Sequence, residues 1–178
     1  MRVCHISTVH YTYDTRIFFK YIKSAIENDI SIDYITTKND KSQIIKGIDF
    51  YFLNPHKGFF GRIKKNIQAY KYAKKVKAKI IHFHDPELIF ISILLKVFHR
   101  KKIIYDIHEI YHDAISHKKT LGKFTRFFMS RAYLITEKFF LRFFDLLVLA
   151  EDNYKKYYKG YNFIILRNYI NYRNILDK

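Results

Sequence analysis

Two short segments of this chain end an apolar run in a cluster of imidazole and carboxylate side chains. In the first, His82 and His84 alternate along the run and Asp85 follows directly; in the second, Asp106 and His108 have the same spacing. Imidazoles and carboxylates so arranged could exchange protons with a substrate or bind a metal ion. Because open α/β sheets bind ligands at the carboxyl ends of their strands, these segments predict a functional edge of a sheet.

A metal site is one interpretation of these residues. His82, His84 and Asp85 could ligate a metal ion together with four further residues, which are His108, Glu109, His112 and Asp113. Their spacing matches no closed zinc pattern, and the barrel hydrolases that use such clusters need more strands than this chain holds. We therefore expect no metal.

Acid–base chemistry is the second interpretation. The carboxylate of Asp106 could orient the imidazole of His108, which would set its tautomer and basicity, and a solvated polar turn is the alternative. Asp85 stands immediately before Pro86, so it is also predicted to cap a helix that begins at this proline. Capping and a functional role are compatible at the end of a strand.

Residues 7–16, which follow the first apolar run, contain no glycine. This disfavours the phosphate-binding loop of a dinucleotide enzyme. Asp14 or Thr15 is predicted to cap the next helix, and Arg16 is predicted to be a solvated residue of its first turn. His10 has no comparable structural explanation, and it is therefore a candidate for the site.

Strands that alternate with helices must position these residues. The predicted strands are 2–7, 30–36, 49–53, 79–84, 102–106, 145–150 and 162–166. The predicted helices are 15–27, 60–77, 86–98, 121–144 and 152–158, with an irregular polar stretch over 110–119. This alternation predicts an α/β fold with a doubly wound, mainly parallel, Rossmann-like sheet.

The chain has 178 residues, which is enough to bury the core of a single domain. Its one cysteine, Cys4, lies in the first apolar run, so we expect a buried inert thiol and a cytoplasmic protein. The amino terminus is too polar for a signal peptide, and the longest apolar stretch, 88–95, is too short to cross a bilayer.

The formal net charge of +17 indicates an anionic partner or a compositional bias towards lysine. Basic and aromatic residues alternate in the predicted helix 121–144, which favours peripheral attachment to an anionic membrane surface, such as the inner face of the plasma membrane. The membrane-facing candidates are Lys123, Arg126, Phe127, Phe128 and Arg131. Nucleic acid competes as a partner on charge alone and is less favoured.

Four motifs occur in order along nearly the whole chain. They are Ser7-x-x-His10-x-x-x-Asp14-x-Arg16-Ile17-Phe18, His82-x-His84-Asp85-Pro86-Glu87-Leu88, Tyr105-Asp106-x-His108-Glu109 and Arg167-Asn168-Tyr169. Together they resemble the N-terminal domain of family 4 glycosyltransferases, which are GT-B enzymes of capsule, exopolysaccharide and lipopolysaccharide assembly.

The resemblance implies sugar transfer from a nucleotide sugar to a glycan or lipid-linked acceptor, in a cleft between two Rossmann-like domains. It implies no metal, and no cofactor apart from that donor substrate. His108 would face the donor sugar, with Asp106 and Glu109 as further catalytic candidates. The candidates for acceptor binding are His10, Asp14, Arg16, His84, Asp85 and Glu87.

On this interpretation, residues 1–166 are the acceptor-side domain and residues 167–178 begin a linker to a second domain. The sequence contains none of the donor-binding residues of that second domain, so we expect an isolated chain to be inactive and to need a separate donor-binding chain. Two other functions stay open, a non-catalytic membrane-bound module with the same fold and a basic nucleic-acid-binding α/β domain.

Overall fold

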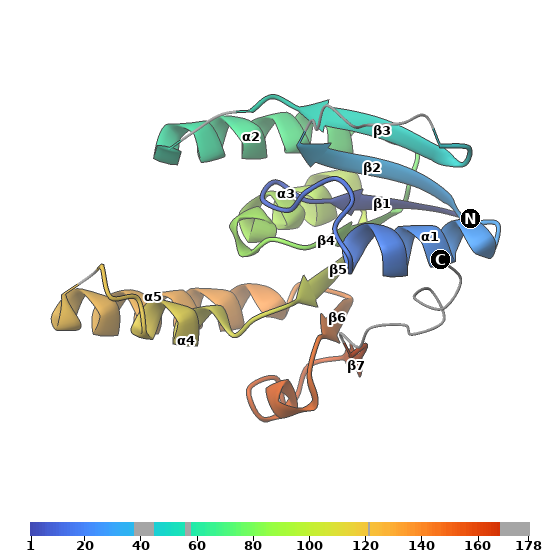
Figure 1. Ribbon diagram of the computed structural model, residues 1–178. Coiled ribbons are helices and arrows are strands. Elements are labelled where there is room, and N and C mark those ends of the chain that lie inside the picture. The colour runs from blue at the N-terminus through green and yellow to red at the C-terminus, as the bar shows by residue number, and fades with distance from the viewer. Residues whose placement is uncertain (38–44, 56–57, 121, 168–178) are drawn as a thin grey trace, which may run out of the picture.

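Seven strands form one sheet in the computed structural model, which describes residues 1–37, 45–55, 58–120 and 122–167. They are β1 (Arg2–Ile6), β2 (Ser31–Thr37), β3 (Ile48–Leu53), β4 (Ile80–Phe83), β5 (Lys102–Ile107), β6 (Leu146–Leu149) and β7 (Phe163–Ile165). Their order is β3-β2-β1-β4-β5-β6-β7, and all neighbours are parallel (Figure 1). The predicted doubly wound, Rossmann-like α/β class is confirmed.

Helical segments connect the strands. They are η1 (Ile17–Ile22), α1 (Lys23–Glu27), α2 (Gly58–Ala73), η2 (Pro86–Leu88), α3 (Ile89–His99), α4 (Tyr111–Ser116), α5 (Lys123–Leu141) and η3 (Asp152–Lys156). Because side chains alternate between the two faces of a strand, the sheet has a core on each side. The larger core lies under α2, α3 and α5, and the smaller one lies between η1 and the strands β2 and β3.

Two helical stretches differ from the prediction in kind. The helix predicted over 15–27 opens as the π-helix η1, in which the amide of Tyr21 donates to the carbonyl of Arg16 (3.2 Å). The stretch predicted to be irregular over 110–119 contains α4. The π-helix was not predicted because a short apolar run does not distinguish a π-helical period from an α-helical one. The helix α4 was not predicted because it is stabilised by packing against α5, which no local sequence pattern shows.

The remaining helices differ in detail. The chain after Asp85 forms the 3-10 turn η2 before α3 begins, and η3 is a 3-10 helix in the place of the helix predicted over 152–158. No helix within the described parts of the chain is long and apolar enough to cross a membrane. Cys4 is fully buried, as predicted, and burial raises the pKa of its thiol.

The strand order reverses direction between β1 and β4, since the chain moves from β1 outward to β3 and then returns to β4 on the other side. At such a switch point the connections leave in opposite directions, and a crevice opens at the carboxyl ends of the two strands. The two predicted clusters follow β4 and β5, and the loop 7–16 follows β1. The fold therefore brings all three segments to one edge.

Residues 168–178, which hold Asn168, Tyr169 and most of the predicted linker, lie outside the described residues.

Candidate functional site at the carboxyl edge of the sheet

Asp85 holds the loop that follows β1. Its Oδ2 accepts hydrogen bonds from the Ser7 hydroxyl (3.0 Å) and from both the amide (2.6 Å) and the hydroxyl (3.2 Å) of Thr8. The amide of Val9 donates to the same oxygen (3.3 Å). Asp85 stands at the N-cap position of η2 with Pro86 at its start, as predicted, but its side chain makes no capping hydrogen bond to η2. The carboxylate of Asp85 instead accepts hydrogen bonds from backbone amides of the β1 loop, which would otherwise have no partner.

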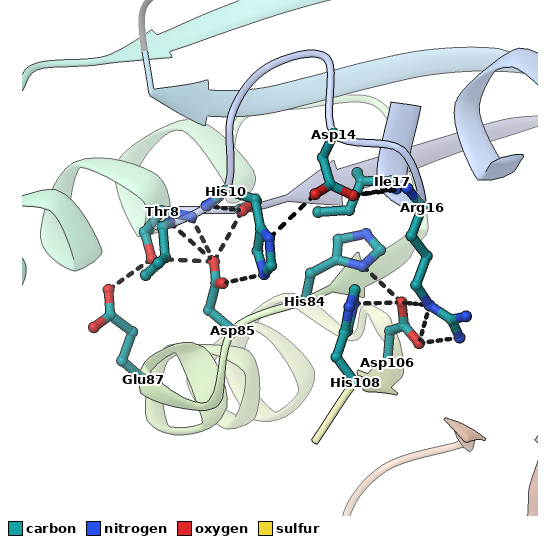
Figure 2. Close-up of polar contacts among 12 residues, drawn as sticks. Thr8, His10, Asp14, Arg16, Ile17, His84, Asp85, Glu87, Asp106 and His108 are labelled. Atoms are coloured by element: carbon teal, nitrogen blue, oxygen red, sulfur yellow. Dashed lines mark hydrogen bonds and ion pairs between the residues drawn. The ribbon is translucent and has the colours of Figure 1, made fainter. Parts of the chain in front are cut away.

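His10 lies at the centre of the site (Figure 2). Its Nδ1 is 3.4 Å from Asp14 Oδ2, and its Nε2 is 3.4 Å from Asp85 Oδ1. Its ring stacks on that of His108, with centroids 5.2 Å apart. Contact with Asp14, reinforced by the charge of Asp85, outweighs burial and raises the pKa of His10. The two carboxylates therefore favour the protonated form of this imidazole relative to that of an ordinary histidine.

Asp14 caps the following helix as predicted, since its Oδ1 accepts from the amides of Arg16 (2.8 Å) and Ile17 (2.9 Å). Burial opposes ionisation, yet His10 and these two amides lower the pKa of Asp14. Arg16 is only 2% exposed, so the prediction of a solvated first-turn residue is wrong. The wide turn of η1 begins here, and the guanidinium of Arg16 points under the loop towards Asp106.

Asp106 is fully buried and is the hub of the second cluster. It accepts hydrogen bonds from Nε (3.1 Å) and Nη2 (2.9 Å) of Arg16. Nδ1 of His84 lies 3.1 Å from its Oδ2. Nε2 of His108 lies 2.7 Å from the same oxygen. Burial alone would raise the pKa of Asp106, but His108, His84 and Arg16 hold it well below its usual range. The carboxylate is therefore ionised. Nε2 of His108 lies within ion-pair distance of it but makes no hydrogen bond among the described residues, so the predicted orienting of His108 by Asp106 stays a prediction.

A chain of imidazoles continues from Asp106 into the sheet. Nε2 of His84 lies 3.0 Å from Nδ1 of His5, and His82 packs against both rings. Because an ionised carboxylate only accepts, His84 carries its proton on Nδ1 and accepts from His5 through Nε2. Burial lowers the pKa of His5, His82 and His84, so all three are neutral. His5 was not predicted; the signal was its place on β1, in register with His82.

A pocket of about 450 Å³ opens at this edge. This volume is that of a small-molecule site. Of the predicted residues, its lining includes His10, His84, Asp85, Glu87, Asp106, His108 and Glu109. The lining residues that the sequence did not predict are Val9, Arg62, Pro86, Tyr105, Tyr111 and Tyr133. Asp14 and Arg16 do not line the pocket and instead support the residues that do.

Glu87 joins the pocket rim to the β1 loop. Its Oε1 accepts from the Thr8 hydroxyl (2.6 Å), and Nη1 of Arg62 lies 3.8 Å from its Oε2. Nζ of Lys65 donates to the carbonyl of Thr8 (2.6 Å). Arg62 of α2 therefore stands beside a carboxylate of the pocket, and Lys65 holds the β1 loop. An α2 residue could not be assigned to the site from the sequence, because several basic residues are spread along this helix and no acidic residue of the helix distinguishes one of them.

The membrane-facing candidates are on α5, and none of them lines the pocket. Phe127 (58%) and Phe128 (66%) are exposed, Lys123 and Arg131 are exposed too, and Arg126 is half-buried. The guanidinium of Arg131 lies 5.7 Å from the centroid of the Phe127 ring. The helix thus presents basic and aromatic side chains together, as the sequence predicts.

Two groups of side chains in the described parts of the chain are close enough to share a metal ion. They are His5, His82 and His84, and His84, Asp106 and His108, with ligand atoms within 4.8 Å of one another in each group. Of the ligands considered from sequence, Asp85, Glu109, His112 and Asp113 belong to neither group. Asp85 is occupied by the β1 loop, and His112 pairs with Asp113 (3.4 Å) on α4.

Neither a protein-family model nor any curated protein matches this sequence. Among solved structures, sucrose-phosphate synthase from Thermosynechococcus elongatus is similar, with a TM-score of 0.69 and 14% identity over 97% of this chain. A shorter structure of the same enzyme has a TM-score of 0.66 and 13% identity over 98% of this chain, and is itself covered to 93%. This chain spans about half (49%) of the longer structure. At such identity the likeness shows the fold alone: a Rossmann-like α/β domain that matches a GT-B glycosyltransferase structure.

Proposed function

We propose that this chain forms the acceptor-binding side of a glycosyltransferase, which passes a sugar from a nucleotide-sugar donor to a glycan or lipid-linked acceptor in surface polysaccharide synthesis. One observation carries the proposal. In a pocket at the switch point of the sheet, the stacked imidazoles of His10 and His108 each contact a buried carboxylate, Asp85 and Asp106 respectively. The GT-B likeness supports the reaction class.

The pocket offers what a sugar requires. Carboxylates accept hydrogen bonds from hydroxyl groups, and imidazoles can accept or donate them. The rings of Tyr111 and Tyr133 provide apolar surface for the faces of a sugar ring. Asp85 uses Oδ2 for the β1 loop and keeps Oδ1 towards His10, so a hydroxyl that replaces or joins His10 would meet this oxygen.

His108 is the proposed catalytic residue. Its Nε2 lies against Asp106, which leaves Nδ1 as the nitrogen for a ligand. We propose that the ionised carboxylate of Asp106, 2.7 Å away, favours one tautomer and one orientation of this imidazole. We propose that His108 faces the donor sugar and that Arg16 and His84 act through Asp106 as positioning residues. Glu109 is exposed at the pocket rim and is a second candidate for contact with the sugar.

The donor nucleotide is proposed to bind on a second domain that faces this pocket. The β1 loop has no glycine at which a diphosphate could approach the backbone closely, and its amides at Thr8 and Val9 already bond to Asp85. The proposal therefore places the acceptor here and the nucleotide across a cleft, on a domain of the same or of another chain.

An acceptor with a lipid anchor suits the surroundings of the pocket. The helices α2 and α5 both begin on the same side of the molecule as the carboxyl ends of the strands, at the left of Figure 1. Phe59 (74%) and Phe60 (78%) are exposed at the start of α2, and Phe124 (84%) is exposed at the start of α5. Aromatic groups beside lysines and arginines favour the interface of an anionic membrane.

Ligand-observed NMR tests the proposal, with octyl β-glucoside below its critical micelle concentration as a probe that joins a sugar to a short lipid. We expect binding to the wild-type chain and at least ten-fold weaker binding to His10→Ala, because His10 is an acceptor-binding candidate that lines the pocket. Lys118→Ala, which removes an exposed charge outside the pocket, is the control. Equal binding by the wild type and His10→Ala would overturn the site assignment.

Catalysis is tested by adding a donor-binding domain of a GT-B enzyme together with uridine- and guanosine-diphosphate sugars. The chain alone is expected to transfer no sugar, and the mixture is expected to transfer sugar in a way that depends on His108. Transfer by the chain alone would contradict the proposed division between two domains.

The aromatic face of α5 favours a second function, a non-catalytic module that binds anionic membranes. Sedimentation with phosphatidylglycerol vesicles tests it, with phosphatidylcholine vesicles as the control. Binding to phosphatidylglycerol that is lost in Phe127→Ser/Phe128→Ser, with no sugar binding, would favour this module over the transferase. Salt-sensitive binding to DNA or RNA without vesicle binding would support the nucleic-acid function instead.

A further inference from the structure

Three imidazoles meet beneath Tyr21 on the face of the sheet that η1 covers. His5, His82 and His84 are 3%, 6% and 2% exposed, and their ring centroids are 4.6–5.3 Å apart. One nitrogen of each ring lies within 4.8 Å of one nitrogen of each of the others. Of these three imidazoles, only that of His84 lines the pocket. The proposed transfer reaction therefore gives no role to His5 and His82.

The sheet itself brings these rings together. His5 on β1 is the register partner of His82 on the neighbouring strand β4, and His84 follows two residues later on the same side. Desolvating three imidazoles is unfavourable unless their nitrogens find partners. His5 and His84 satisfy one another, whereas Nε2 of His82 is buried without a hydrogen-bond partner among the described residues.

We propose that His5, His82 and His84 form a binding site for a divalent transition-metal ion of the Zn²⁺ class. This goes beyond the proposed transferase function, and it departs from the expectation of no metal. Zinc binds imidazole nitrogens at about 2.0–2.1 Å, which places the ligand nitrogens of a tetrahedral site roughly 3.3 Å apart. Nδ1 of His5 and Nε2 of His84 are already 3.0 Å apart. A small ring rotation therefore converts this contact into two ligands.

The surroundings of His84 match those of a metal ligand. Its Nδ1 contacts the buried carboxylate of Asp106, and a carboxylate behind an imidazole is the usual arrangement that fixes the tautomer and orientation of a zinc ligand. The alternative group, His84 with Asp106 and His108, is a poorer site. The guanidinium of Arg16 already neutralises Asp106 there, and it would repel a second cation. Three protein ligands leave one position for water.

The test uses the full chain without a histidine tag, stripped with a chelator and titrated with Co²⁺ and then with Zn²⁺. We expect one equivalent of Co²⁺ with the visible spectrum of a tetrahedral site, displacement by Zn²⁺, and a higher midpoint of thermal unfolding. X-ray absorption of the zinc form is expected to show nitrogen and oxygen ligands only. His82→Phe keeps the packing of the ring and is expected to weaken binding at least 100-fold.

His117→Asn, which changes an exposed histidine outside the cluster, is the matched control and is expected to bind as the wild type does. Asp106→Asn is expected to weaken binding by 10- to 100-fold. If His82→Phe fails to fold, the cobalt spectrum and the X-ray absorption of the wild type decide whether a tetrahedral site with nitrogen and oxygen ligands is present. No bound metal, or binding that His82→Phe leaves unchanged, would overturn the site and leave a hydrogen-bonded imidazole chain. Binding of octyl β-glucoside is independent of this result.

Discussion

Glu137 on α5 carries a prediction about stability and pH. It is 2% exposed, its Oε1 accepts from the hydroxyl of Tyr133 (3.2 Å), and its Oε2 has no hydrogen-bond partner among the described residues. Burial raises the pKa of Glu137 to about 7, from an ordinary value of 4.5. Between these two pH values the folded state keeps a proton that the unfolded state has released.

The sign follows from this difference in bound protons. Stability falls as the pH rises from about 4.5 to about 7, and the loss is complete above the pKa of the folded state. A separation of about 2.5 pKa units corresponds to about 3 kcal/mol. Glu137→Gln keeps the acceptor oxygen for Tyr133 and cannot ionise. It is expected to raise the free energy of unfolding at pH 8 by up to about 3 kcal/mol and to change it little at pH 4.5.

Urea unfolding of the wild type and Glu137→Gln at several pH values measures this difference. Glu27→Gln, at an exposed position of α1, is the control for removing a carboxylate from the surface. Since other groups titrate in the same range, the relevant quantity is the difference between variant and wild type at each pH. A difference that stays constant from pH 4.5 to 8 would show that Glu137 does not keep a proton in the folded state over this range.

Three further predictions concern the site, each measured on the isolated chain. Arg16→Ala leaves the buried carboxylate of Asp106 without its cation and is expected to cost roughly 3–5 kcal/mol in urea unfolding; a cost under about 1 kcal/mol would contradict the buried pair. Asp85→Asn is expected to speed hydrogen exchange at the Thr8 amide, while exchange in the strands stays unchanged. With a chelator present, the wild type is expected to lose stability as the pH falls below 6.5, because the buried histidines resist protonation; His5→Phe should lessen this loss.

The order of elements and the place of the site could be predicted from sequence, for a definite reason. Apolar runs end abruptly at His84 and at Asp106, and in a parallel sheet all such ends meet at one edge. The strand order itself was not predicted, but the alternation of strands with helices sufficed to place the β1 loop at the same edge.

Long-range pairing could not be read from the chain. Arg16 was predicted to be solvated because its local context is that of a first helical turn, yet a partner 90 residues away buries it. Asp85 was predicted to cap a helix because Pro86 follows it, but the donors of the β1 loop lie closer. His5 was hidden in an apolar strand, and only the register of β1 against β4 shows its partners.

The most direct test of the central claim, that this edge of the sheet binds an acceptor sugar, is a titration of the ¹⁵N-labelled chain with octyl β-glucoside, observed at the histidine side chains. The imidazole signals of His10 and His108 are expected to shift together and saturate, while those of His99 and His117, which do not line the pocket, stay in place. Shifts confined to other histidines, or no saturable shift at His10 and His108, would contradict the claim.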